Sequence, residues 1–204
     1  MMKAQEIKRI AKFALFGAVG FGIGGVIIGA GFLAKLTAEE GIGLILLGGI
    51  ATGAIGGAAL GLALNRGWRK TALLAIAGAV SFSAGAFLAI LPVGFLVWLR
   101  AYWLFGYPNI EEVWLFVVFG SVLGLVGGAG LGLAMRGCGT SLGLAIAGAL
   151  GFGIGHMILG MIVHYFEHFV LLFSPWTAIL GIIGGSFLGA ALGFLEKGRV
   201  KNQK

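Results

Sequence analysis

The chain has 204 residues, of which 59% are hydrophobic and only 10% are charged. In a soluble domain about a quarter of the residues are charged, so this composition excludes a water-soluble globular protein and indicates an integral membrane protein. Glycine occurs 40 times and proline three times without a Gly-X-Y period, which excludes collagen and a disordered linker. The single cysteine, Cys138, excludes an intramolecular disulfide and a cysteine-based metal site.

The net charge of +7 is distributed in a pattern that is typical of membrane topology. When the chain is threaded back and forth, all 14 basic residues except Lys35 and Arg100 fall on one side of the membrane. Most of the acids fall on the other side, namely Glu39, Glu40, Glu111, Glu112 and Glu167. This positive-inside pattern predicts a multi-pass protein of a plasma or inner cell membrane, with both termini cytoplasmic. We expect lipid rather than nucleic acid as the partner of the basic residues.

Six apolar segments follow one another along the chain, each long enough to cross a hydrocarbon core of about 30 Å. Residues 1–12 are predicted as a basic tail, and the predicted spans are 10–33, 41–64, 71–91, 113–135, 141–164 and 176–195. Tight basic turns are predicted at 65–70 and 136–140, and Pro92 is expected to kink or end the third helix. Ser174 and Pro175 are interpreted as the N-cap and first turn of the sixth helix. The sequence therefore predicts an all-α, polytopic membrane protein.

Four glycines recur at a spacing of four residues in the second, fourth and sixth predicted spans. Residues four apart lie almost above one another on a helix, so each series forms a ridge without side chains. Such ridges let helix backbones approach closely in lipid, and we therefore predict glycine-zipper packing. The alternative is that the ridges line a narrow path or face a flat cofactor, and the sequence leaves open which helix each ridge faces. The series are Gly49, Gly53, Gly57 and Gly61; Gly120, Gly124, Gly128 and Gly132; and Gly181, Gly185, Gly189 and Gly193.

The first, third and fifth spans share the motif G-A-[VL]-[GS]-F, at 17–21, 78–82 and 148–152. The chain is thus predicted to be a single membrane domain, 1–204, built from three copies of a two-helix hairpin. The copies cover about 8–66, 67–136 and 137–198. Because each copy holds an even number of spans, all three point the same way, and we expect a pseudo-threefold axis along the membrane normal.

Histidine is the most distinctive polar residue type in this chain. His156 stands where the other copies have Gly25 and Ala86, and neutral imidazole is a common metal or haem ligand, so His156 is a candidate cofactor ligand. His164 and His168 are candidate metal ligands as a pair; His164 lies about 12 Å along the helix from His156, too far to share a metal with it. The alternative is that His156 bonds to a neighbouring helix and that the chain holds no cofactor.

Few other residues carry chemistry. Apart from Lys12 at the start of the first span, the predicted spans contain no Asp, Glu, Lys or Arg, and the chain contains no Asp, which argues against a charge-coupled pump and against an enzyme. The buried hydroxyls are expected to be interhelical hydrogen-bond donors, at Thr52, Ser81, Ser83, Ser121 and Ser186. Aromatic side chains of the outer segments are predicted to anchor at the interface or to contact a partner, namely Trp98, Trp103, Tyr107, Trp114 and Trp176.

These observations leave three functions open. The first is a non-catalytic scaffold or accessory subunit that forms homo-oligomers or joins other membrane subunits. The second is a passive channel or transporter for an uncharged or hydrophobic solute along the threefold axis. The third is haem or pigment binding through His156.

Overall fold

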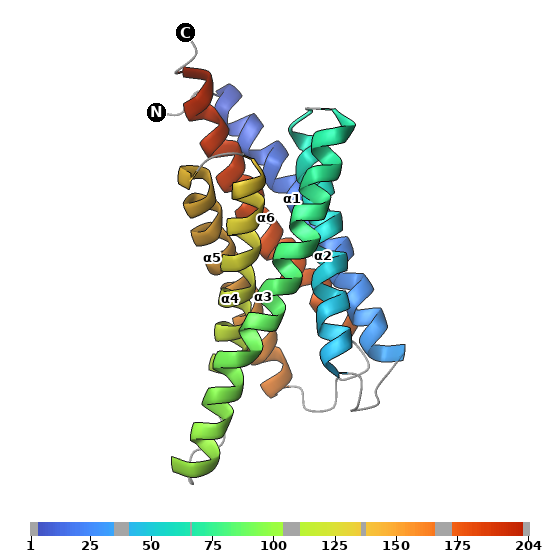
Figure 1. Ribbon diagram of the computed structural model, residues 1–204, viewed down its shortest axis with the longest axis vertical. Helices are drawn as coiled ribbons and strands as arrows, with labels where there is room; N and C mark the ends of the chain where they lie inside the picture. The colour runs from blue at the N-terminus through green and yellow to red at the C-terminus, as the bar shows by residue number, and fades with distance from the viewer. Residues whose placement is uncertain are drawn as a thin grey trace.

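The computed structural model describes residues 4–34, 41–65, 67–103, 111–135, 138–165 and 173–201. Side chains are described for 4–27, 43, 45–65, 67–95, 113–135, 139–162 and 177–196. Within the described residues the chain forms six helices (Figure 1). They are α1 (Ala4–Ala34), α2 (Gly41–Ala63), α3 (Trp68–Trp103), α4 (Glu111–Ala134), α5 (Cys138–Tyr165) and α6 (Phe173–Lys201).

Each of the six described helices contains a segment that is long and apolar enough to cross a membrane. Helices suit this environment because every backbone group inside them is hydrogen-bonded without help from water. Large apolar side chains such as Leu15, Ile76 and Leu142 point outward and are mostly exposed. Such an exterior fits lipid rather than water, so the chain is a multi-pass membrane protein.

Helix α3 differs most from its predicted bounds. It runs through Pro92 to Trp103, so of the two expectations for this proline the helix end is wrong, and a kink stays a prediction. Proline removes one amide donor from the helix interior, and spanning helices tolerate such a loss because neighbouring groups satisfy the freed carbonyl. With 36 residues, α3 is about 54 Å long at a rise of 1.5 Å per residue.

The other helices differ from their predicted bounds by smaller amounts. Helix α1 begins at Ala4, so most of the predicted basic tail is helical. Helix α6 begins at Phe173, one residue before the predicted cap Ser174, and continues to Lys201. Helix α5 already begins at Cys138, inside the predicted turn 136–140. Polar residues thus extend the helices beyond the apolar segments from which the spans were predicted.

The turn between α2 and α3 is shorter than the predicted 65–70. Asn65 and Gly67 have φ angles of 50° and 85°, in the left-handed region that glycine and asparagine enter most readily. The amide of Leu64 donates to the carbonyl of Leu60 at 3.1 Å, which closes the last turn of α2. Reversal within these few residues makes α2 and α3 antiparallel neighbours.

The described helices form a closed ring in chain order, since each contacts the one before it and the one after it, and α6 contacts α1. Both chain termini lie at the same end of the ring, at the top of Figure 1, which we name the terminal end. The opposite end, where α1, α3 and α5 finish and α2, α4 and α6 begin, is the far end. Helix α3 projects past the other helices there (Figure 1).

Three phenylalanine rings, from α1, α3 and α5, meet inside the ring of helices. The ring centroids of Phe21 and Phe82 are 5.1 Å apart, those of Phe21 and Phe152 are 5.7 Å apart, and those of Phe82 and Phe152 are 5.3 Å apart. The rings are tilted or edge-to-face, which are arrangements that aromatic pairs prefer. We name Phe21, Phe82 and Phe152 the phenylalanine cluster; each is at most 2% exposed.

Further buried side chains fill the interior between the phenylalanine cluster and the terminal end. Two helical turns before each phenylalanine, the odd-numbered helices place an apolar side chain in the same core. The even-numbered helices each add a leucine. These residues are Phe13, Leu74 and Leu144, with Leu60, Leu131 and Leu192. The core is therefore continuous on this side of the cluster.

The glycine series lie where neighbouring helices approach most closely. A Cβ atom at Gly53 would meet the carbonyl oxygen of Gly78, and one at Gly124 would meet that of Gly148. The series on α2, α4 and α6 thus face α3, α5 and α1 respectively, which is the next helix around the ring. Backbone atoms also crowd a Cβ at Gly49, Gly57, Gly61, Gly120, Gly128, Gly132, Gly181, Gly185, Gly189 and Gly193.

Candidate functional site

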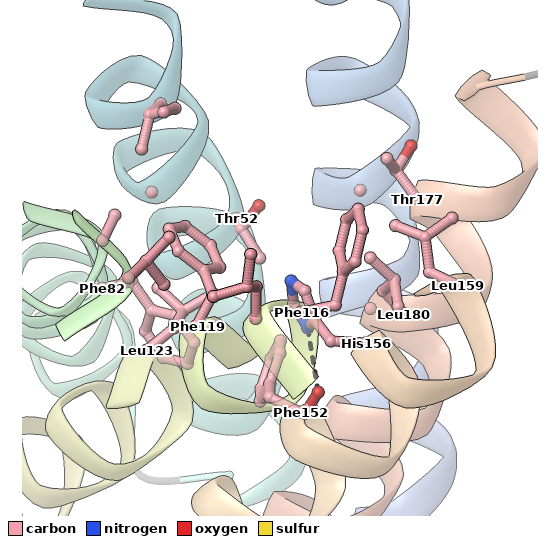
Figure 2. A pocket seen from close by; sticks show the side chains of 17 residues that line it. Thr52, Phe82, Phe116, Phe119, Leu123, Phe152, His156, Leu159, Thr177 and Leu180 are labelled. Atoms are coloured by element: carbon pink, nitrogen blue, oxygen red, sulfur yellow. Dashed lines mark hydrogen bonds between the residues drawn. The ribbon is translucent and has the colours of Figure 1, made fainter. Parts of the chain in front are cut away.

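A pocket of about 540 Å³ lies inside the ring of helices, on the far-end side of the phenylalanine cluster. Phe82 and Phe152 belong to both, so the cluster forms the floor of the pocket. Each of the six described helices contributes to the lining, and Figure 2 shows the side chains converging from several of them. The pocket is therefore central to the bundle, between helices distant in sequence.

The walls of the pocket are mainly apolar. Helix α4 supplies one wall with Leu115, Phe116, Phe119 and Leu123, and Leu159 and Leu180 come from α5 and α6. None of the described lining residues carries a charge. An ion would lose its hydration here without a compensating partner, so the lining favours an uncharged molecule.

One polar group enters the pocket at a position that the sequence singled out. Gly25, Ala86 and His156 each lie one helical turn beyond a phenylalanine of the cluster, and all three line the pocket. The first two bring at most a methyl group, whereas His156 brings an imidazole. The histidine that the sequence analysis singled out therefore lines the pocket.

The hydrogen bond of His156 fixes the roles of its two ring nitrogens. Nδ1 lies 2.8 Å from the carbonyl oxygen of Phe152, in the same helix and not in a neighbouring one as the alternative interpretation expected. A carbonyl only accepts, so Nδ1 carries the proton, and Nε2 of the neutral ring is an acceptor. Figure 2 shows this second nitrogen directed away from Phe152 and into the pocket.

The imidazole is also held sterically. Its ring lies 5.6 Å from that of Phe119, centroid to centroid. A Cβ atom at Gly120 would collide with Nδ1, so this glycine of α4 leaves the room that the ring needs. His156 is 8% exposed. The orientation of Nε2 is therefore set by packing from α4 and by the hydrogen bond within α5.

Thr52 is the second polar group to consider. It is 5% exposed and lines the pocket from α2. Its Oγ1 is buried without a hydrogen-bond partner among the described residues, although buried hydroxyls are normally bonded. Thr177, on α6, is a third buried polar residue of the lining. Sequence reasoning missed the pocket role of both threonines, because a hydroxyl in an apolar helix more often bonds to a neighbouring helix.

Ser81 and Ser186 show what such hydroxyls ordinarily do. Oγ of Ser81 lies 2.7 Å from the carbonyl oxygen of Ala77 in its own helix and 3.2 Å from that of Gly127 on α4. A hydroxyl has one hydrogen to donate, and the shorter distance favours the bond within α3, so the predicted interhelical role of Ser81 stays a prediction. Ser186 donates to Ile182 of its own helix at 2.7 Å. The prediction of an interhelical bond is thus wrong for Ser186. It is also wrong for Thr52, whose Oγ1 has no partner in the part of the chain that the structure describes.

The remaining predicted site residues lie toward the far end or outside the described residues. His164 is in the last turn of α5, but its side chain is not described, and His168 lies outside the described ranges. Trp98, Trp103 and Trp176 lie on α3 and α6 with undescribed side chains, Tyr107 lies outside the described residues, and Trp114 on α4 is mostly exposed. In the described part of the chain, no group of three or more His, Cys, Asp or Glu residues could hold a metal ion.

Comparison with protein-family models, curated proteins and solved structures finds no match to this chain. Family membership therefore supplies no function. The pocket, with its apolar walls and buried polar groups, is the feature from which a function can be argued.

Proposed function

We propose that this chain is a non-catalytic membrane protein that binds an uncharged, largely apolar molecule in the central pocket and acts as a passive carrier for it. The pocket is the observation that carries this proposal. Its volume of about 540 Å³ falls in the range of small-molecule sites, roughly 300–1,000 Å³. Its described lining is apolar with a few polar groups, which is the usual composition of such sites.

The architecture that we propose around this pocket is three parallel two-helix repeats related by a pseudo-threefold axis. The phenylalanine cluster supports this proposal, because each member is the last residue of the repeated motif and comes from a different repeat. Close backbone approaches at all three glycine series support the glycine zipper. In this arrangement the zippers join each repeat to the next and form a rigid frame around the pocket.

The proposed orientation places both termini in the cytoplasm. Basic residues lie at the terminal end of the bundle, including Lys8, Arg9 and Lys12 on α1 and Arg69 and Lys70 on α3. Positive charge is typical of the cytoplasmic side of a plasma or inner membrane. The pocket then lies in the outer half of the bilayer, and the core between the cluster and the terminal end separates it from the cytoplasm. Transport would require a second conformation in which this core opens.

The haem alternative finds less support in the pocket. Haem carries two carboxylates, which proteins commonly pair with cations or strong hydrogen-bond donors. The described lining residues include no Lys or Arg, so His156 would have to hold the group by one iron bond alone.

The binding proposal can be tested with a photoreactive alkane carrying a diazirine group, added to the protein in lipid nanodiscs. We expect mass spectrometry to find adducts on pocket residues such as Leu159 and Phe119. Ala86→Leu, which adds volume inside the pocket, should abolish these adducts. Ala84→Leu is the matched control, since Ala84 lies two residues away on the exposed face of α3. Adducts confined to lipid-facing residues, alike in both variants, would refute the proposal.

A second candidate function, as a subunit of a membrane assembly or homo-oligomer, is favoured by the length of α3. With 36 residues, α3 is longer than the roughly 20 residues that cross a hydrocarbon core, and its last part, which holds Trp98 and Trp103, projects past the other helices at the far end (Figure 1). A photocrosslinking amino acid at position 98, in native membranes, should capture a second copy or another subunit. The same amino acid at Trp68, exposed at the terminal end, is the control. Equal yields of products at both positions would contradict a docking role for α3.

A further inference from the structure

The imidazole of His156 brings one unused hydrogen-bond acceptor into the pocket. Nδ1 donates to the carbonyl oxygen of Phe152 at 2.8 Å, so Nε2 of the neutral ring can only accept. Among the described residues the imidazole makes no other hydrogen bond. Figure 2 shows Nε2 directed into the pocket, and the side chain is 8% exposed. Buried polar groups are normally bonded, so a bound molecule with one donor would supply the bond that Nε2 lacks.

The two threonines of the lining do not extend this polar site. Oγ1 of Thr52 is buried without a partner among the described residues and faces Gly24 in the contact between α1 and α2, so a ligand in the pocket does not reach it. Thr177 already has a partner within the protein. The ligand therefore needs one donor, and the donor belongs opposite Nε2 of His156.

Aromatic rings make up much of the remaining lining. Phe82, Phe116, Phe119 and Phe152 line the pocket from α3, α4 and α5. Aromatic pairs in tilted or offset arrangements attract one another beyond the effect of buried area alone. The imidazole itself shows this geometry, with its ring 5.6 Å from that of Phe119 and tilted by 49°. A flat aromatic molecule would gain such contacts here, and an aliphatic one would not.

We propose that the pocket recognises an uncharged aromatic molecule with a ring N–H group, such as an indole or a pyrrole. This inference rests on the proposed function and specifies the chemistry of its ligand. The ring N–H donates to Nε2 of His156, and the ring packs against Phe116 and Phe119 of α4. An indole N–H is a donor without an acceptor, so the bound molecule brings no other polar atom into the apolar pocket.

Other classes of molecule match the site less well. A hydrocarbon, an ether or a ketone has no donor for Nε2. A hydroxyl donates, but its oxygen also needs a donor, and a buried polar group without a partner is costly. A carboxylate or an ammonium group would be buried without an opposite charge in the described lining.

Competition between two isomers tests the donor separately from binding itself. The probe is the diazirine-bearing alkane of the binding test, and the competitors are skatole and N-methylindole at equal concentrations in the nanodisc bilayer. The two have the same atoms and nearly the same shape, but only skatole has a ring N–H. One net hydrogen bond corresponds to about a threefold to tenfold difference in affinity. We expect skatole to compete better than N-methylindole by this factor.

Two variants assign the effect to the named side chains. His156→Ala copies the counterpart Ala86 and should make the two isomers compete equally. Ser141→Ala is the matched control, because this serine lies on the same helix but donates to the carbonyl of Ala129, outside the pocket. Phe116→Leu should weaken both isomers alike, since it removes a ring contact and keeps the acceptor.

A spectroscopic measurement needs no variant and stands even if His156→Ala does not fold. A hydrogen bond to Nε2 changes the nitrogen NMR signal of that atom. Skatole should shift the Nε2 signal of His156 in the unaltered protein, and N-methylindole should not. A side chain with only a structural role would respond to both isomers alike.

The outcomes separate the two proposals. Labelled pocket residues with equal competition by the two isomers would overturn the ring N–H inference and leave the binding proposal standing. A larger advantage of para-cresol over its isomer anisole than of skatole over N-methylindole would also overturn it, in favour of a phenol. Unchanged competition in Phe116→Leu would overturn the aromatic part. If the alkane probe labels no pocket residue, the proposed function itself fails, and this inference with it.

Discussion

The imidazole of His156 lies in the space that a side chain on Gly120 would occupy. A Cβ atom at Gly120 would collide with Nδ1 of the histidine and crowd the carbonyl oxygen of Phe152 to which that nitrogen donates. Because Gly120 on α4 has no side chain, the interior has room for the imidazole of His156 on α5. The position of the imidazole in the pocket therefore depends on two residues from different helices, Gly120 and His156.

Gly120→Ala is expected to displace the imidazole and to destabilise the protein. Overpacking of a filled interior lowers the free energy of unfolding by about 1–3 kcal/mol. Gly139→Ala is the control, because a Cβ there would meet nothing within 4 Å. Thermal unfolding in nanodiscs, followed by tryptophan fluorescence, measures both. Equal midpoints for the two variants would show that the histidine moves aside without penalty.

Gly53→Ala is expected to separate α2 from α3. Its new methyl group would meet the carbonyl oxygen of Gly78, which belongs to a backbone and cannot turn away as a side chain can. We expect a loss of about 1–3 kcal/mol in the free energy of unfolding. Gly43→Ala, on the same helix with open space around it, should be neutral or slightly stabilising, since alanine favours helix. Denaturation in mixed micelles compares the two, and a similar loss in both would contradict zipper packing at Gly53.

The helices could be predicted from sequence because lipid imposes a simple requirement on length and polarity. The six apolar segments of the sequence predict six spanning helices, but the predicted helix ends lie where the apolar residues stop. Helix formation depends on backbone hydrogen bonds and not on apolar character alone, so α1 extends back to Ala4 and α3 extends through Pro92 to Trp103. Proline is a weak sign of a helix end in a spanning helix, because neighbouring groups satisfy the carbonyl that it frees.

The pocket was less predictable than the helices. The repeat alignment singled out His156, because its counterparts are Gly25 and Ala86. Which nitrogen faces the pocket, however, depends on the position of the Phe152 carbonyl, and the lack of a partner for Thr52 depends on how α1 and α2 pack. Such facts concern distances between helices, and a hydropathy pattern does not contain them. The partner helix of each glycine series was undetermined for the same reason.

Phe82→Ala is expected to destabilise the core strongly. The ring is fully buried and contacts Phe21 and Phe152, and deleting a buried phenylalanine ring lowers the free energy of unfolding by about 3–5 kcal/mol. Phe87→Ala, on the same helix but 53% exposed, should lose much less, because lipid replaces most of its contacts. Unfolding midpoints of the two variants test this, and comparable losses would mean that the cluster does not close the core.

Thr52→Val is expected to stabilise the protein. The Oγ1 atom of Thr52 is buried without a partner among the described residues and faces Gly24 of α1. A buried hydroxyl without a partner disfavours the folded state, so replacing it by a methyl group should raise the free energy of unfolding by about 1–3 kcal/mol. Thermal unfolding in nanodiscs measures the change, with Thr71→Val, whose hydroxyl bonds to Gly67, as the control that should gain nothing. A Thr52→Val protein that is destabilised would show that its hydroxyl is satisfied within the protein.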